Sequence, residues 1–465
     1  MPRYSIAVTT VDRPQVLEAS LAALLALPRD DIEIVVSDNY SDARTQEVLT
    51  HFDDPRLRTL RTERRLPMPE HWEWVWQQMT GDYVIFVGDD SALTPGALIA
   101  ADKAIEDYGA EIVSWRCAHY YHPDWKVHYK HLPTRGNVLA IDMGFTHELY
   151  RVDTDAVIEH FCETLRLSGC FPSVINFLVK RSLGDEIRAN TGAFHWAPCP
   201  DISASFFALG SIRPGRFVFW DGLGGIGGRS NDSNVASLLS RGKRSKRLRE
   251  WLDEFESPEA RFPLHDYRIE SISNLLAAPI TQAAKLLPDR FNGFRISVKT
   301  LAVKSIDDAY LERTVPWADD PTFLAQLEGL IAELPPREQD DARGHLAQAR
   351  TAMAEQDSRG EAEPNPTPPA EARGLLRFLS EESFSEWRRN WELYRSIGRN
   401  PIDRFWEFGD TIYCDMRAFG GESLADVAGA LPQVLAAFET GEPGFARHYR
   451  GCGMLTEKLE QVAPA

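Results

Sequence analysis

Apolar runs alternate with helical patterns along the first 120 residues or so. Short apolar segments predict strands at residues 4–10, 32–36, 57–60, 82–87 and 112–115. Apolar residues at helical spacing predict helices after Asp12, which we interpret as an N-cap, after Ser41 and Asp42, over residues 71–79, and from Pro95 to near Gly109. This alternation predicts an α/β fold with a mainly parallel central sheet and helices on both faces.

The pattern changes near residue 235, after which helical periodicity dominates. Residues 356–372 are rich in Pro, Glu and Asn and predict a flexible linker. Beyond it, Phe384, Trp387, Trp391 and Tyr394 fall on one helical face, which favours a packed core over a ligand platform. We therefore predict an α/β domain over residues 1–245, a helical region over 246–355, a linker over 356–372 and a C-terminal helical region over 373–465.

Ligands of parallel sheets bind outside the carboxyl ends of the strands, so polar residues that follow the predicted strands are candidates for a site. These residues are Thr9, Thr10, Asp38, Asn39, Asp89 and Asp90. Gly88-Asp89-Asp90 follows the most apolar strand. Two adjacent carboxylates there repel each other, and a divalent cation such as Mg²⁺ or Mn²⁺ removes that repulsion. A solvated turn is the alternative for this pair.

Asp38 ends the second predicted strand. A carboxylate at this point accepts a hydrogen bond from a ring N–H of a nucleobase, which favours a pyrimidine. The alternative is a local turn, with Ser41 or Asp42 capping the next helix. Both interpretations stay open at this stage.

The order of these segments resembles family 2 glycosyltransferases of the GT-A fold. The resemblance rests on Thr-Thr-x-Asp-Arg-Pro after the first strand, Ser-Asp-Asn-x-Ser-Asp after the second, and Gly-Asp-Tyr-Val-Ile-Phe-Val-Gly-Asp-Asp at residues 81–90. It extends over about residues 4–235. It implies that Asp38 contacts the base, Asp89 lies near the ribose or the metal, and Asp90 binds Mn²⁺ or Mg²⁺. Thr9, Thr10 and Arg13 would line the nucleotide pocket. Ser91 stands where the family often has a third acidic residue.

Two further sets of residues gain a role from the resemblance. Arg61, Arg64 and Arg65 form a basic cluster, from which a residue such as Arg65 would meet the diphosphate; a solvated surface run is the alternative. Asp201 follows an aromatic segment at residues 192–196 and begins a helix. It would be the catalytic base that takes the proton of the acceptor hydroxyl, with an N-cap as the alternative and Asp185 and Glu186 as competing carboxylates.

Other motifs carry weaker signals. His195 lies among aromatic residues and is interpreted as structural rather than as a metal ligand. An H-x-x-H pair at His119 and His122 on an extended segment does not form a metal site, since the two rings point to different faces. Residues 221–231 match a dinucleotide fingerprint formally, but without a βαβ unit we interpret them as a mobile loop that closes over a ligand and offers Arg229, or as a plain flexible loop.

The net charge and the cysteine content limit the classes of partner and the cellular compartment that fit this chain. The formal net charge of the 465-residue chain is −18, which argues against nucleic acid as a partner. The six cysteines form no C-x-x-C pair, which fits a reduced cytoplasmic compartment. No signal pattern or transmembrane segment is predicted, and a peripheral membrane contact stays open.

The sequence thus predicts a metal-dependent, inverting glycosyltransferase. Its donor would be a nucleoside-diphosphate sugar, with a UDP-sugar favoured, and its acceptor a hydroxyl of a glycan or polysaccharide precursor. The alternative is an inactive nucleotide-binding or interaction protein. A sugar-nucleotide pyrophosphorylase ranks lower, because the loop after the first strand lacks glycine.

Overall fold

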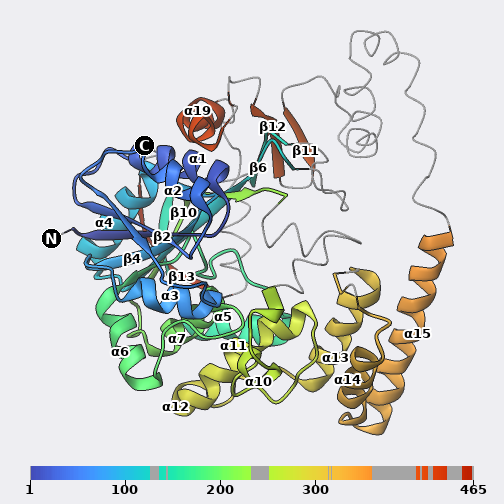
Figure 1. Cartoon of the computed structure of the whole chain (residues 1–465). Coiled ribbons are helices and arrows are strands. Elements are labelled where there is room, and N and C mark those ends of the chain that lie inside the picture. Colours follow the sequence, from blue (N-terminus) through green and yellow to red (C-terminus); the bar gives the residue numbers. More distant parts are fainter. Residues whose placement is uncertain are drawn as a thin grey trace.

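The computed structural model describes residues 2–125, 136–142, 145–231, 251–312, 314–315, 317–358, 405–408, 411–416, 421, 423–436 and 453–462. Figure 1 shows an α/β domain at the N-terminal end, coloured blue to green, and a row of helices along its lower side, coloured yellow to orange.

Four parallel strands form the N-terminal half of the sheet, in the order β3-β2-β1-β4. Their bounds are β1 Tyr4–Thr10, β2 Ile32–Asp38, β3 Leu57–Arg61 and β4 Tyr83–Gly88. Nearly every residue of β1, β2 and β4 is buried, as expected for strands covered on both faces. The predicted strands here are confirmed to within one or two residues at their ends.

The sheet continues beyond β4 with mixed directions. β9 (Leu178–Lys180) lies antiparallel between β4 and β6 (Ile112–Tyr121). β6 also pairs in parallel with β10 (Phe217–Arg229) and antiparallel with β7 (Val138–Asp142). β10 further pairs antiparallel with β5 (Ala92–Leu93) and β8 (Glu148–Val152). The sheet is therefore mainly parallel only in its N-terminal part.

Helices cover both faces of this sheet. Ile6 and Val8 of β1 pack with α1 and α4 on one face, whereas Ala7 packs with α3 and the α5–α7 group on the other. The helices are α1 Pro14–Leu25, α2 Ala43–Leu49, α3 Met68–Trp76, α4 Pro95–Tyr108, α5 Thr154–Thr164, α6 Arg181–Thr191 and α7 Pro200–Ser211. This alternation of side chains along β1 confirms the predicted layered α/β architecture.

A helical region follows over residues 258–358. Its helices are α10 Pro258–Arg261, α11 Ile272–Leu286, α12 Pro288–Phe291, α13 Val298–Ile306, the π-helical turn η2 Asp307–Leu311, α14 Pro321–Ala332 and α15 Pro336–Ser358. α11 packs against α7, and the two regions share one apolar core. The predicted boundary at 245 and most of the predicted linker lie outside the described residues, as do Phe384, Trp387, Trp391 and Tyr394.

The C-terminal segment is not purely helical, which corrects the prediction for residues 373–465. β11 (Phe405–Phe408) and β12 (Thr411–Asp415) extend the sheet from β7, and β13 (Leu455–Gln461) pairs with β8. α19 (Leu424–Ala436) is helical as predicted, and it packs against α1. β11 and β12 have only four and five residues, so their period-2 pattern gives a weak signal in the sequence.

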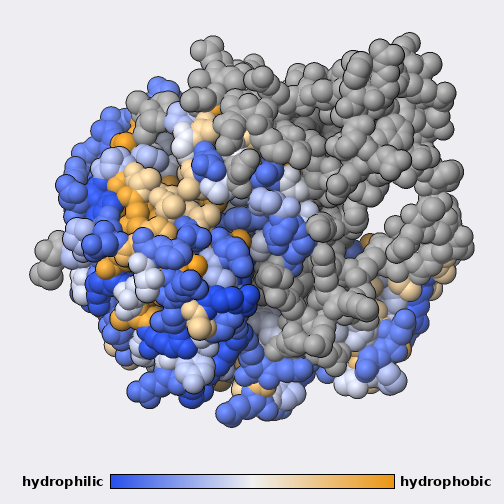
Figure 2. Space-filling model, turned by 45° about the horizontal axis from the view of Figure 1, so that its top comes forward, coloured by the Kyte–Doolittle hydropathy of each residue, from blue (hydrophilic) through white to orange (hydrophobic). Residues whose placement is uncertain are grey.

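On the face that Figure 2 shows, the described residues are mostly hydrophilic, and the most extensive apolar area lies over the α/β domain. Within the described residues, no helix combines the length and apolar character needed to cross a bilayer. The five cysteines in this part of the chain are free thiols.

Candidate active site

The carboxyl ends of three neighbouring parallel strands meet at one edge of the sheet. β1 lies between β2 and β4, with Thr10 opposite Asp38 and Thr9 opposite Gly88. The Asp89–Asp90 pair follows β4 directly. The structure thus brings the predicted residues of the three strand ends to the edge where ligands of such sheets bind.

Arg13 lies between the two adjacent carboxylates. Its Nη1 forms an ion pair with Asp89 Oδ1, and its Nη2 lies 2.6 Å from Asp90 Oδ2. The same Nη2 donates a hydrogen bond to Ser230 Oγ at 2.8 Å, and Thr10 Oγ1 donates one to Asp89 Oδ2 at 2.7 Å. One planar guanidinium therefore bridges both carboxylates.

The two carboxylates differ in their proton affinity. Burial raises the pKa of Asp89 to about 6; Arg13 acts against this shift and the charge of Asp90 adds to it. Burial acts on Asp90 in the same direction, but attraction by Arg13 and His122 outweighs it and holds the pKa of Asp90 below its usual range. Two adjacent buried carboxylates stay ionised only beside a cation, and here Arg13 is that cation.

Two segments pack against the Asp90–Ser91 turn: His122, which follows β6, and Gly228 of β10. His122 Nε2 lies 3.2 Å from the Asp90 carbonyl oxygen, and the Gly228 N–H donates to Ser91 Oγ at 3.3 Å. A Cβ on Gly228 would lie 1.7 Å from the Asp90 carbonyl oxygen, so glycine is required there. The interpretation of residues 221–231 as a loop is therefore wrong: the glycines belong mostly to a strand, where they allow close packing.

Asp38 is fully buried, and its carboxylate accepts three hydrogen bonds. Oδ1 accepts from the Ser41 N–H at 2.8 Å; Oδ2 accepts from Arg61 Nη1 at 2.5 Å and from Gln46 Nε2. A carboxylate offers about four acceptor positions, so little capacity is left for a ligand while Arg61 stays in place. Arg61 also lies 5.1 Å from the ring centroid of the exposed Tyr40.

Arg61 and Gln46 contact Asp38, and the sequence pattern alone does not assign them to it. Arg61 was grouped with Arg64 and Arg65, although it lies directly opposite Asp38 in the β2–β3 register. That register is the signal that identifies it. Asp42, not Ser41, caps α2, with its side chain accepting from the N–H groups of Arg44 and Thr45.

Asp12 joins the loops that follow β1, β2 and β3. Its N–H donates to Ser41 Oγ at 2.8 Å, its carboxylate accepts from the Asp42 N–H at 3.0 Å, and it pairs with Arg65 Nη1 at 2.8 Å. Asp12 is therefore not the N-cap of α1, a position that Arg13 takes. Arg65 lies half-exposed beside this loop junction, next to the site.

Asp201 lies in the first turn of α7, whose N-cap is Cys199. The N-cap alternative for Asp201 is thereby excluded. Ser173 Oγ donates to Asp201 Oδ2 at 3.1 Å, and burial raises the pKa of Asp201 while the Ser173 hydrogen bond opposes the shift. Asp201 and His195 line the same small cavity of about 10 Å³, which is room for about one water.

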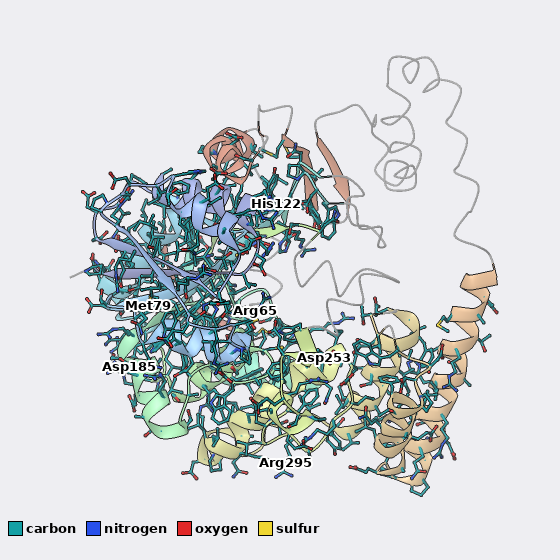
Figure 3. All side chains as sticks on the ribbon, in the orientation of Figure 1. Arg65, Met79, His122, Asp185, Asp253 and Arg295 are labelled. Carbon is teal, nitrogen blue, oxygen red and sulfur yellow. The ribbon has the colours of Figure 1, made fainter. Side chains whose placement is uncertain are left out.

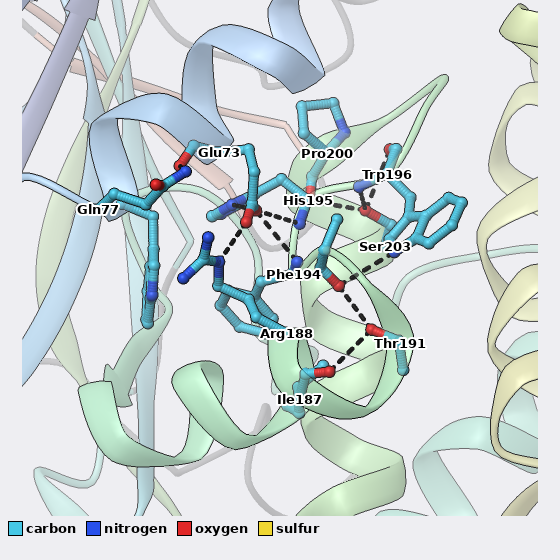
Figure 4. Close-up of polar contacts among 12 residues, drawn as sticks. Glu73, Gln77, Ile187, Arg188, Thr191, Phe194, His195, Trp196, Pro200 and Ser203 are labelled. Atoms are coloured by element: carbon cyan, nitrogen blue, oxygen red, sulfur yellow. Dashed lines mark hydrogen bonds and ion pairs between the residues drawn. The ribbon is translucent and has the colours of Figure 1, made fainter.

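Glu73 of α3 anchors the loop that leads to Asp201 (Figure 4). Its carboxylate pairs with Arg188 Nε and accepts hydrogen bonds from the N–H groups of Phe194 and His195 at 3.1 and 3.2 Å. His195 Nδ1 lies 3.4 Å from the same carboxylate. Burial would raise the pKa of Glu73, but His195 and Arg188 outweigh it and lower the pKa to about 2. This supports the structural interpretation of His195.

Asp185, the competing carboxylate on α6, accepts a hydrogen bond from Trp76 Nε1 at 2.9 Å. Figure 3 places Asp185 on the far side of the domain from His122, which contacts Asp90. Asp185 is therefore not part of the site at the strand ends. Glu186 follows it on the same helix.

A family model and several known proteins match parts of this chain. Residues 5–164 match the family model "Glycosyl transferase family 2". The N-terminal part of this chain is a family 2 glycosyltransferase domain. The match covers the strand ends of β1, β2 and β4, and ends before Asp201.

One curated relative and several solved structures are similar to this chain. The GalNAc(5)-diNAcBac-PP-undecaprenol beta-1,3-glucosyltransferase of Campylobacter jejuni is 31% identical over 112 residues, which is 23% of this chain and 36% of that protein. The chain thus spans little more than a third of that relative's length. The structure of S. aureus TarS 1-349 with UDP-GlcNAc is 16% identical, with a TM-score of 0.43, over 77% of this chain and 92% of that one. The TarS 1-349 complex with UDP is 14% identical, with a TM-score of 0.38, over 79% and 94%.

The strand-end site has a donor set that suits a divalent cation only together with a ligand. Within the described residues, no group of three or more His, Cys, Asp or Glu side chains is arranged to hold a metal ion. Mg²⁺, however, is commonly bound by one or two carboxylates plus substrate phosphates and water. Asp89 and Asp90 supply the two carboxylates of that donor set, and the positive charge of Arg13 already lies between them.

Proposed function

We propose that this chain transfers a sugar from a nucleoside-diphosphate sugar to a hydroxyl acceptor, with inversion and with Mn²⁺ or Mg²⁺ as the cofactor. The observation that carries the proposal is the meeting of Asp38, Asp89 and Asp90 at one sheet edge of a family 2 domain, with Arg13 bridging the last two. A UDP-sugar is the favoured donor, and a glycan or polysaccharide precursor the favoured acceptor.

The nucleoside would occupy the β1 and β2 strand ends. Asp38 would accept an N–H of the base once Arg61 turns away from it, and the partly exposed Arg61 has room to move. Thr9, Thr10 and Asp89 would lie around the ribose. Arg13 and Arg65 would receive the diphosphate, since a guanidinium matches the geometry of phosphate oxygens.

Asp90, with Asp89 beside it, would hold the metal. When bound, the cation neutralises the negative charge that develops on the departing nucleoside diphosphate. The residues around the metal site position Asp90. Gly228, His122 and Ser91 fix the backbone and side chain of Asp90, so that its carboxylate stays at the strand end.

Asp201 would act on the acceptor. The acceptor oxygen forms a bond to the anomeric carbon as the bond from that carbon to the diphosphate oxygen breaks, and the hydroxyl proton passes to the Asp201 carboxylate. A single displacement of this kind inverts the anomeric configuration. The buried setting that raises the pKa of Asp201 makes it a stronger base than an exposed carboxylate.

A donor screen tests the proposal. The full chain is incubated with a panel of nucleotide sugars, Mn²⁺ and simple glycan acceptors, and mass spectrometry follows the donor and the product. We expect one donor to be consumed with release of its nucleoside diphosphate, and no consumption after chelation with EDTA. Nucleotide binding without consumption of any donor would favour the alternative of an inactive binding protein.

We propose a cytoplasmic location, and this proposal rests only on the cysteine usage.

A further inference from the structure

Arg13 lies where a divalent cation would neutralise the Asp89–Asp90 pair. Its two terminal nitrogens each pair with a different carboxylate, and Nη2 also donates to Ser230. Only 17% of the Arg13 side chain is exposed, and the two carboxylates are 4% and 10% exposed. In the ligand-free protein the site thus already contains a cation that belongs to the chain itself.

The charges explain what this contact does to a metal ion. Two carboxylates and one guanidinium give the site a net charge of about −1. A divalent ion that entered alone would turn this into a net positive charge and would face the guanidinium at close range. A diphosphate changes the balance, because it brings at least two negative charges and offers Arg13 a new partner of matching geometry.

We propose that Arg13 is an internal counter-cation that keeps divalent metal away from Asp89 and Asp90 until a nucleoside diphosphate binds. Arg13 then pairs with the diphosphate, and the carboxylates become available to the metal. Metal and nucleotide therefore bind cooperatively, and Arg13 adds to the coupling that direct contact between metal and diphosphate supplies. The nucleotide half of this inference rests on the proposed function, whereas the metal half concerns the ligand-free protein alone.

The contacts around Arg13 allow such an exchange. Thr10 keeps its hydrogen bond to Asp89, and Ser91 Oγ donates to Asp90 Oδ1 at 3.1 Å, so both carboxylates keep a partner when the guanidinium leaves. Arg13 stands at the N-cap of α1 without a side-chain capping bond. Its side chain can therefore turn without loss of a cap.

Titration with Mn²⁺ alone, followed by the electron paramagnetic resonance signal of free Mn²⁺, tests the metal half. We expect weak binding to the unaltered chain and at least roughly tenfold tighter binding, to one site, in Arg13→Met. Arg13→Lys, which keeps a charge but cannot bridge two carboxylates, should fall between them. The double variant Arg13→Met/Asp90→Asn should lose the gain. Equal Mn²⁺ affinity of Arg13→Met and the unaltered chain would overturn the proposal.

Arg3→Met is the matched control. Arg3 forms an ion pair with Glu106 at the opposite end of β1, so its removal should leave Mn²⁺ binding unchanged. Thermal melting of each variant shows whether the chain is folded; if Arg13→Met does not fold, Arg13→Lys alone must show the gain, and equal affinity there overturns the proposal as well.

Calorimetry with UDP and GDP, with and without Mn²⁺, tests the nucleotide half. In the unaltered chain each ligand should tighten binding of the other by the same factor. That factor should be smaller in Arg13→Met than in the unaltered chain, and an equal factor would overturn the nucleotide half. Failure of both nucleotides to bind, together with tighter Mn²⁺ binding by Arg13→Met, would count against the proposed function and leave the metal half standing.

Discussion

The Thr10 hydroxyl donates a hydrogen bond of 2.7 Å to the Asp89 carboxylate across 79 positions of sequence. Thr10 ends β1, and Asp89 follows β4. The bond exists because the two strands are parallel neighbours, which places their carboxyl ends together. The bond connects the end of β1 to the Asp89–Asp90 pair, so the two strand ends lie in direct contact and not as separate turns.

Asp90→Asn should remove metal-dependent donor binding. The substitution keeps the shape and the hydrogen-bonding capacity to Ser91 but removes the charge that a divalent ion needs. Loss of a residue that hydrogen-bonds a metal ligand typically costs about 10–100-fold in metal affinity, so loss of the ligand itself should cost at least about 100-fold. Calorimetry with nucleotide and Mn²⁺ measures the effect. Unaltered Mn²⁺ dependence in Asp90→Asn would exclude Asp90 as the metal ligand.

Asp201→Asn should abolish transfer and leave donor binding nearly intact. General bases contribute about 10²–10⁴-fold, so kcat should fall by at least about 100-fold. Asp185→Asn is the control, because Asp185 lies on α6 away from the strand ends and contacts Trp76. Transfer assays and donor titrations on both variants provide the measurement. A role for Asp201 as base is ruled out by full turnover of Asp201→Asn.

The pH profile should report the raised pKa of Asp201. The base works in its ionised form, so kcat/KM should fall as the pH drops through that pKa, at a pH above the usual range for Asp.

The raised pKa of Asp201 also affects the stability of the fold. The folded state holds the proton more tightly than the unfolded state, so ionised Asp201 destabilises the protein at neutral pH. Asp201→Asn should therefore raise the Tm at pH 7, whereas a lower Tm would show that the charge is stabilising.

Glu73→Gln should destabilise the protein at neutral pH. The pKa of Glu73 is lowered to about 2, so its contribution is fully present above its ordinary pKa of 4.5 and is lost as the pH falls toward 2. Gln leaves Arg188 without its charged partner, at a cost of about 1–3 kcal/mol. Thermal melting from pH 7 to pH 3 should show the gap to the unaltered chain narrowing. A gap that stays constant with pH would contradict this assignment.

Gly228→Ala should displace the backbone of Asp90, because the added Cβ would lie 1.7 Å from its carbonyl oxygen. We expect a loss of donor binding and a lower Tm. Gly344→Ala is the matched control: it lies in α15, and its Cβ would meet no atom within 4 Å. Replacing a helical glycine should leave binding unchanged and stabilise by about 0.5–1 kcal/mol. Equal effects of the two substitutions would contradict the role of Gly228.

The sequence predicts the strand ends well, because strong signals coincide there. Buried parallel strands form nearly continuous apolar runs, and the residues that follow them carry the polar groups. The predicted end of the Pro95 helix near Gly109 is likewise confirmed: Gly109 is the C-cap of α4, with a left-handed φ of 61° that favours glycine. These features depend on a few neighbouring residues and so can be inferred from one sequence.

Contacts between residues far apart in the chain could not be predicted from the sequence pattern. The bridge that Arg13 forms to Asp89 and Asp90 depends on tertiary packing of β1 on β4. Residues 221–231 resemble a loop in sequence because seven of these positions are Gly, Asp or Asn, which are depleted in strands. In the structure, however, β6 and β5 pair with most of this segment. The C-terminal strand β13 could not be predicted from its own residues either, because its strand structure depends on pairing with β8.

Binding of nucleoside diphosphates in the presence and absence of Mn²⁺ tests the central claim most directly. Calorimetry on the unaltered chain should show that one of UDP, GDP, ADP or CDP binds to a single site, with affinity raised by Mn²⁺. Asp90→Asn should lose the Mn²⁺ effect while remaining folded. Absence of binding for all four nucleotides, or binding that neither Mn²⁺ nor Asp90→Asn alters, would contradict a metal-dependent nucleotide-sugar site at this edge of the sheet.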